Sequence, residues 1–103
     1  MEPGYAYMWE FRVRPERLHE FLRAYGSQGE WVRLFGRGEG YLRTELHQDR
    51  EDPHRFVTID YWRSAEDWSA FRSSFAAEFA TLDARCEDLT LEERRIGVFR
   101  PVS

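Results

Sequence analysis

The chain has 103 residues, a formal net charge of −4 and a pI near 5.4, and 17% of its residues are aromatic. This length predicts one domain, residues 1–103, with a single hydrophobic core. The acidic balance, with no long basic run, excludes the concentrated positive field that nucleic-acid binding requires.

The composition also limits chemistry and location. Lysine is absent, which excludes Schiff-base chemistry by a lysine side chain. The single cysteine, Cys86, has no internal disulfide partner, as is typical of a reducing compartment. No signal-peptide pattern or membrane-length apolar run is found, so we expect a cytoplasmic protein with no membrane association.

Residues 5–14 alternate in period two, with Tyr5, Tyr7, Trp9, Phe11 and Val13 on one side, which predicts a strand with one fully apolar face. Pro15 suits the first turn of a helix that we expect to run to Tyr25, with Gly26 ending it in a left-handed conformation. A second short helix is expected from Ser27 or Gln28 to Phe35.

Residues 40–64 read as two alternating strands joined by a polar loop at 47–55. One predicted face is mainly apolar and carries Leu42, Thr44, Leu46, Val57, Ile59 and Tyr61. The opposite face mixes aromatic and ionisable groups and carries Tyr41, Arg43, Glu45, His47, Phe56, Thr58, Asp60 and Trp62. Such a mixture suits neither water nor a core, so it is the candidate site for chemistry.

In the last third of the chain, Ser64 and Asp67 form a helix-capping pattern. Apolar residues at helical spacing then predict one long helix of about 24 residues, with Cys86 buried on its apolar stripe. Thr90 and Glu93 resemble a capping box that opens one more turn, before a last strand at 96–100.

This order of elements predicts an α+β, ferredoxin-like βαββαβ domain with a four-stranded antiparallel sheet and helices on one face. The mixed face of the hairpin would then be left bare. We expect a second copy to cover it, which gives a homodimer with a cavity between two sheets.

Several segments resemble the antibiotic biosynthesis monooxygenase family, a branch of the dimeric α+β barrel proteins. They are EFLRAYG at 20–26, WVRLF at 31–35, GYLRTEL at 40–46, IDYWRS at 59–64 and LDARCE at 82–87. The resemblance implies a homodimer that oxidises an aromatic quinol with O2, without metal or flavin. The protein would bind a substrate anion able to pass an electron to O2, so no cofactor is expected.

Family oxygenases carry an inner-face Trp late in the third strand and an Asn four residues before it. Trp62 matches the first, but Thr58 stands at the second place and the chain has no Asn. Haem-degrading relatives carry a Trp and a His where this chain has Phe71 and Thr81, so haem degradation is not expected.

The resulting site hypothesis places Trp62 as a flat wall, Asp60 or His47 as proton acceptor, and Arg43 as anion stabiliser. The expected substrate-binding residues are Tyr41, Phe56, Thr58 and Glu10. No metal site is expected, because Glu16 and His19 would supply only two ligands.

Each residue also has a structural interpretation. Trp62 would plug the dimer interface, Asp60 would pair with Arg12 or Arg43, and His47 would face solvent. Two functions remain as hypotheses. The first is a cofactor-independent monooxygenase that acts on a small aromatic or quinol. The second is a non-catalytic dimeric module that binds a small ligand or only dimerises. The cavity itself is expected either between helices and sheet or between two sheets.

Overall fold

The computed structural model describes residues 2–102. In chain order its elements are β1 (Tyr5–Val13), the 3-10 turn η1 (Pro15–Arg17), α1 (Leu18–Tyr25), α2 (Glu30–Phe35), β2 (Tyr41–Gln48), β3 (Arg55–Trp62), α3 (Ala65–Ser74), α4 (Ala76–Cys86), η2 (Glu87–Leu89) and β4 (Thr90–Phe99).

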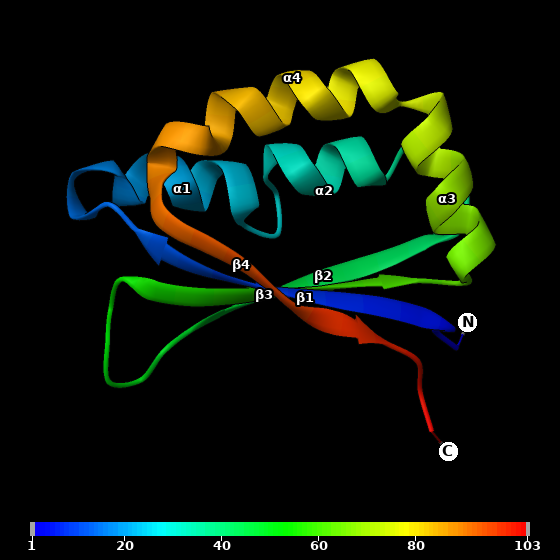
Figure 1. The fold of residues 1–103 in the computed structure, drawn as a ribbon, viewed down its shortest axis with the longest axis horizontal. Coiled ribbons are helices and arrows are strands. Elements are labelled where there is room, and N and C mark those ends of the chain that lie inside the picture. The colour runs from blue at the N-terminus through cyan, green and yellow to red at the C-terminus, as the bar shows by residue number, and fades with distance from the viewer. Residues whose placement is uncertain (1, 103) are drawn as a thin grey trace.

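The four strands form one antiparallel sheet in the order β2-β3-β1-β4. All helices lie on the same side of this sheet, and its other side is bare (Figure 1). The predicted ferredoxin-like fold is confirmed. Among residues 2–102, no helix is long and apolar enough to cross a membrane.

The sheet register corrects the predicted faces of β3. Phe11 pairs with Phe56 and Tyr7 pairs with Asp60, so the mixed set of β3 shares the helix-covered face of β1. The alternating burial agrees: Phe56, Thr58, Asp60 and Trp62 are buried. Val57, Ile59 and Tyr61 therefore point to the bare side. The prediction was wrong by one face, because both sides of this central strand carry bulky residues and its own alternation does not say which is inside.

In β2 the predicted faces are reversed only at the start of the strand, because a β-bulge follows Tyr41. Tyr41 pairs with Trp62 on the helix side, but a register shift follows between Tyr41 and Arg43. Beyond it, Thr44 pairs with Asp60, so Thr44 and not Arg43 faces the helices. A strict two-residue alternation from Tyr41 would have placed them the other way round.

The helix boundaries differ from the sequence prediction at several places, and the second helix begins at Glu30 and not at Ser27 or Gln28. Gly26 has φ −72° and ψ 175°, so the first helix ends in extended and not left-handed backbone. The predicted long helix is divided at Phe75 into α3 and α4. Because both halves face the same sheet, the apolar spacing continues across the break and does not reveal it. Thr90 opens β4 and no helical turn.

Other local predictions are confirmed. The hydroxyl of Ser64 accepts a hydrogen bond from the backbone N–H of Asp67 at 3.1 Å, which caps α3. Cys86 is buried. The core is unusually aromatic: Phe21 lies 5.5 Å from Phe11 and 5.1 Å from Phe56 between ring centres, and Trp62 is completely buried.

Candidate functional site

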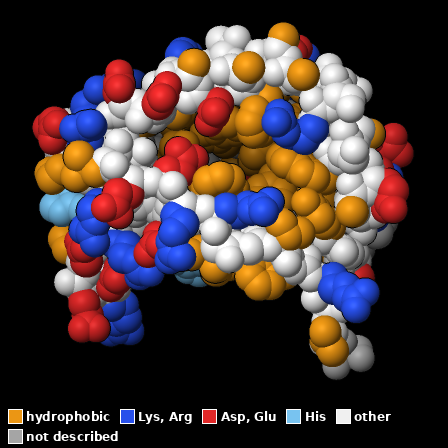
Figure 2. Space-filling view, viewed as in Figure 1, with side chains coloured by type: hydrophobic (Ala, Val, Ile, Leu, Met, Phe, Trp, Pro, Cys, Tyr) orange, Lys and Arg blue, Asp and Glu red, His pale blue; other side chains and the backbone are white. Residues whose placement is uncertain are grey.

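A cavity of about 510 Å³ lies between the helices and the sheet of the single subunit. Its opening appears in Figure 2 as a hollow with hydrophobic walls and basic and acidic side chains at its edge. This volume is in the range of small-molecule sites. The cavity is lined mainly by aromatic side chains: Tyr5, Tyr7, Trp9, Phe11, Tyr25, Trp31, Phe35, Trp68 and Phe79.

The floor of the cavity is the sheet, and Asp60 stands in it between two hydroxyl-bearing neighbours. The register places Tyr7 of β1 on one side of Asp60 and Thr44 of β2 on the other. Thr58 lies one row further along β3, opposite Trp9. Four side chains with polar groups thus lie among the aromatic residues of the lining, namely Tyr7, Thr44, Thr58 and Asp60.

Asp60 is a buried carboxyl group that has no cationic partner among residues 2–102. Only 5% of its surface is exposed, and its side-chain hydrogen bond comes from the Thr44 hydroxyl at 2.5 Å. Burial raises the pKa of Asp60 to about 7, although the Thr44 hydrogen bond opposes part of the rise. A carboxyl group with this pKa can accept and return a proton at neutral pH.

The predicted pairing of Asp60 with Arg12 or Arg43 is not found. Arg12 bonds Asp52 at 2.8 Å, and the Arg43 guanidinium lies 4.0 Å from the centre of the Tyr61 ring. Both arginines project on the bare side of the sheet, whereas Asp60 projects into the cavity.

Trp62 lies behind the cavity wall and has no exposed surface. Its indole N–H donates to the Tyr7 hydroxyl at 3.3 Å, and Tyr7 does line the cavity. Burial, followed by the nearby Asp60 carboxylate, raises the pKa of Tyr7, so its phenol stays protonated. Trp62 therefore orients a lining residue and does not itself form the wall that the sequence predicted.

The remaining predicted contacts divide between the two faces. Tyr41 is half-buried and its hydroxyl bonds Thr44 at 2.7 Å, one step removed from Asp60. Phe56 is a core residue that contacts Phe21.

Arg43, His47 and Glu10 lie on the bare face, away from this cavity. There, His47 and Arg43 both contact Glu45, at 3.1 and 3.4 Å.

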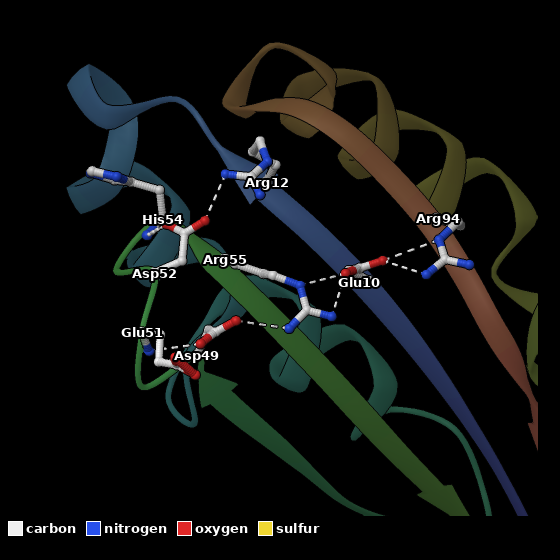
Figure 3. Close-up of polar contacts among 8 residues, drawn as sticks. All are labelled: Glu10, Arg12, Asp49, Glu51, Asp52, His54, Arg55 and Arg94. Atoms are coloured by element: carbon white, nitrogen blue, oxygen red, sulfur yellow. Dashed lines mark hydrogen bonds and ion pairs between the residues drawn. The ribbon is translucent and has the colours of Figure 1, made fainter.

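Glu10 is the centre of an ion-pair network on the same bare face (Figure 3). It bonds Arg94 at 2.7 Å and also Arg55, which in turn bonds Asp49 at 2.9 Å. The hydrogen bonds from Arg94 and Arg55 lower the pKa of Glu10. Glu10 therefore belongs to a surface ion-pair network and does not line the cavity.

The helices supply the roof. Trp31 and Phe35 come from α2, Trp68 from α3 and Phe79 from α4. The Trp31 indole N–H lies near Tyr25 and Cys86, but it makes no hydrogen bond of normal geometry within the described residues. It is a buried donor beside the cavity.

At the rim, α3, α4 and β4 contribute four charged side chains, Arg72, Asp83, Glu93 and Arg95. Within residues 2–102 no group of three or more His, Cys, Asp or Glu side chains is arranged to hold a metal ion.

Sequence reasoning missed the part played by Tyr7 and Thr44, which were counted as core positions. The available signal was a hydroxyl on each of the two strands that flank β3. Because the β2 bulge decides which face Thr44 occupies, only the pairing register shows that its hydroxyl meets Asp60.

Fold and site together define a ferredoxin-like α+β domain with a buried carboxyl group at the base of an aromatic cavity. The family description antibiotic biosynthesis monooxygenase matches residues 5–81. This chain belongs to the antibiotic biosynthesis monooxygenase family. No protein of curated function is a significant match to its sequence.

Similar solved structures agree on the fold. A protein from Nitrosomonas europaea named for the same family is 19% identical, with 96% of this chain and 99% of that one covered and a TM-score of 0.73. SnoaB from Streptomyces nogalater, a cofactor-independent oxygenase, is 19% identical, with 98% and 95% covered and a TM-score of 0.67. A dimeric ferredoxin-like protein from an uncultured marine organism is 18% identical, with 99% and 90% covered and a TM-score of 0.72.

Proposed function

We propose that this protein is a cofactor-independent monooxygenase that oxidises a small planar aromatic or quinol with O2 in the cavity between helices and sheet. The observation that carries the proposal is Asp60, a buried carboxyl group with a pKa of about 7 at the base of an aromatic cavity. Family membership and the likeness to SnoaB support it.

The reaction begins when the Asp60 carboxylate removes an acidic proton from the bound substrate. The substrate anion gives one electron to O2, and the resulting radical and superoxide combine to form a carbon–oxygen bond. The peroxide oxygen takes the proton back from Asp60. Loss of the second C–H proton and cleavage of the O–O bond release water, so a CH2 group and O2 become a carbonyl group and H2O.

The surrounding residues hold the substrate and the proton. Aromatic walls from α2, α3 and α4 sandwich a planar ring and exclude water. The Tyr7 phenol, which stays protonated and is oriented by Trp62, donates a hydrogen bond to a substrate oxygen that becomes anionic. Thr58 offers a hydroxyl where family oxygenases have an amide.

The test is O2 uptake with dithranol, a hydroxylated anthrone whose CH2 group fits this chemistry. Wild-type protein is expected to take up O2 faster than buffer does. In Asp60→Asn the protein-dependent rate should fall by at least about a hundredfold, which is the lower end of general-base effects. His47→Gln is the matched control, because His47 lies on the other face of the sheet, where it contacts Glu45. Equal uptake with and without wild-type protein would contradict the proposal.

The second candidate is a non-catalytic module that binds an aromatic ligand. Thr58 favours it, because it replaces the Asn of the characterised oxygenases and the chain contains no Asn. Dithranol binding without protein-dependent O2 uptake would select this function over the first.

We also propose a homodimer that buries the bare sheet face, although for a different reason from the one predicted. Tyr41, Phe56 and Trp62 do not lie on that face. That face carries instead Val57, Ile59 and Tyr61 of β3, and the exposed Phe99 of β4, which pairs with Ala6. The dimeric marine protein supports the same assembly. Sedimentation as a monomer at micromolar concentration would contradict it.

A further inference from the structure

The cavity rim carries two arginines that no acid neutralises. Arg72 and Arg95 both line the opening, and within residues 2–102 neither forms an ion pair or a side-chain hydrogen bond. The Arg72 guanidinium lies 3.8 Å from the centre of the Phe79 ring, which holds it by a cation–π contact while its N–H groups stay free. Most other arginines near acids in this chain are paired, as Arg55, Arg63 and Arg94 are.

The two acids of the rim, Asp83 and Glu93, lie close together. Burial first, and then repulsion from Asp83, raises the pKa of Glu93. Arg95, by contrast, lies close enough to Tyr5 to oppose the rise in the pKa of that phenol. The acidic pair thus repel each other, whereas Arg95, two positions beyond Glu93 on the same face of β4, lies beside Tyr5.

The sheet register places Arg95 nearer to Asp60 than Glu93. Across the floor, Asp60 pairs with Tyr7, and Tyr7 pairs with Val98 of β4. Arg95 pairs with Trp9 in the next row, and Glu93 pairs with Phe11 one row further away. Since β4 lies two strands from β3, about 10 Å across the sheet, a ligand of two or three fused rings reaches from Asp60 to Arg95.

We propose that the ligand is an aromatic hydroxy acid, whose phenolic end lies at Asp60 and whose carboxylate is bound at the rim by Arg95 and Arg72. This rests on the proposed function for the role of Asp60, but the carboxylate contact is a property of binding alone. Arginine suits it, because a planar guanidinium donates two parallel hydrogen bonds to a carboxylate. The specificity of the cavity is therefore for amphiphilic and not for wholly apolar aromatics.

The test is a calorimetric titration with two matched probes, 2-naphthol and 6-hydroxy-2-naphthoate, which share ring and hydroxyl and differ in the carboxylate. Wild-type protein is expected to bind the naphthoate about tenfold more tightly than the naphthol. The variants to compare are Arg95→Gln and Arg72→Gln. Each should weaken naphthoate binding by about fivefold, which removes most of the preference, and should leave naphthol affinity within about twofold of wild type.

Two further variants sharpen the result. Glu93→Gln removes a negative charge from the rim and should tighten naphthoate binding by about twofold. Arg50→Gln changes an exposed arginine of the β2–β3 loop and should alter neither probe.

Equal affinity of wild-type protein for both probes, or a preference unchanged by Arg95→Gln, would overturn the proposal. No turnover is measured, so absent oxygenase activity with dithranol would reject the proposed function and leave this result standing.

Discussion

Thr44 donates its hydroxyl hydrogen to Asp60 across the β2–β3 pair, at 2.5 Å. Because that hydrogen is committed, the 2.7 Å contact with Tyr41 is a bond that the phenol donates to Thr44. A directed chain of two hydroxyls thus ends on the carboxyl group at the base of the cavity. The hydrogen bond from Thr44 stabilises the ionised carboxylate of Asp60. It therefore lowers the Asp60 pKa and opposes the rise that burial causes.

Thr44→Val removes this donor and should raise the Asp60 pKa further, by about one unit. Carbon-13 NMR titration of the Asp60 carboxyl group measures the pKa directly, and the acidic limb of the O2-uptake profile should move with it. Thr44→Ser keeps the hydroxyl and should restore the wild-type value. A pKa that is the same in the valine variant would show that the bond contributes nothing.

Asp60→Asn should change how stability depends on pH. The folded-state pKa of Asp60 lies above its unfolded value, so its contribution is full below the unfolded pKa and is lost as pH rises through about 7. Relative to Asp60→Asn, the wild type should lose about 3 kcal/mol of unfolding free energy between pH 5 and pH 8.

Urea unfolding at several pH values measures this difference. The exposed Glu51→Gln serves as control and should follow the wild-type curve. Parallel curves for wild type and Asp60→Asn would mean that Asp60 is not desolvated in the folded protein.

Trp62→Phe and Trp68→Phe separate a core residue from a cavity wall. Trp62 is completely buried and bonds Tyr7, so its replacement should destabilise the fold by about 2 kcal/mol. Naphthol affinity should stay within about twofold, since the indole does not line the cavity. Trp68 does line it, and Trp68→Phe should weaken naphthol binding by several fold. The reverse pattern of affinities would make Trp62 the wall.

Glu10→Gln should affect stability and not catalysis. It removes the carboxylate that joins Arg55 and Arg94, so Tm should fall, and more at low salt than at high salt. The lowered pKa of Glu10 means that its contribution is present above its unfolded pKa and is lost as pH falls through the folded one. O2 uptake with dithranol should be unchanged, and a loss of rate without a loss of folded protein would place the chemistry on the bare face.

Alternation and helical spacing were sufficient to predict the order of elements, the ferredoxin-like topology and the capping of α3 by Ser64. They were not sufficient for the faces of the hairpin. β3 has bulky residues on both sides, so its inner face is decided by pairing with β1, a contact distant in sequence. The bulge after Tyr41 reverses the alternation of β2 through backbone geometry, for which a single sequence gives no clear signal.

The candidate site was predicted in part. Asp60 and Thr58, named from the mixed face, do line the cavity, and Tyr41 reaches Asp60 through Thr44. Arg43 and His47 were assigned to the same face as Asp60, and the bulge separates them from it. The rim residues were not predicted. Arg72, Asp83 and Arg95 come from α3, α4 and β4, which are brought together only by tertiary packing, so no local sequence pattern indicates that they lie at one opening.

The most direct test of the account is a crystal structure with danthron, the oxidised product of dithranol, bound to the protein. The account predicts the ligand between the sheet and α2, α3 and α4, with a carbonyl or phenolic oxygen within hydrogen-bond distance of Asp60 or Tyr7. Ligand bound instead on the bare sheet face, beside Arg43 and His47, would contradict it.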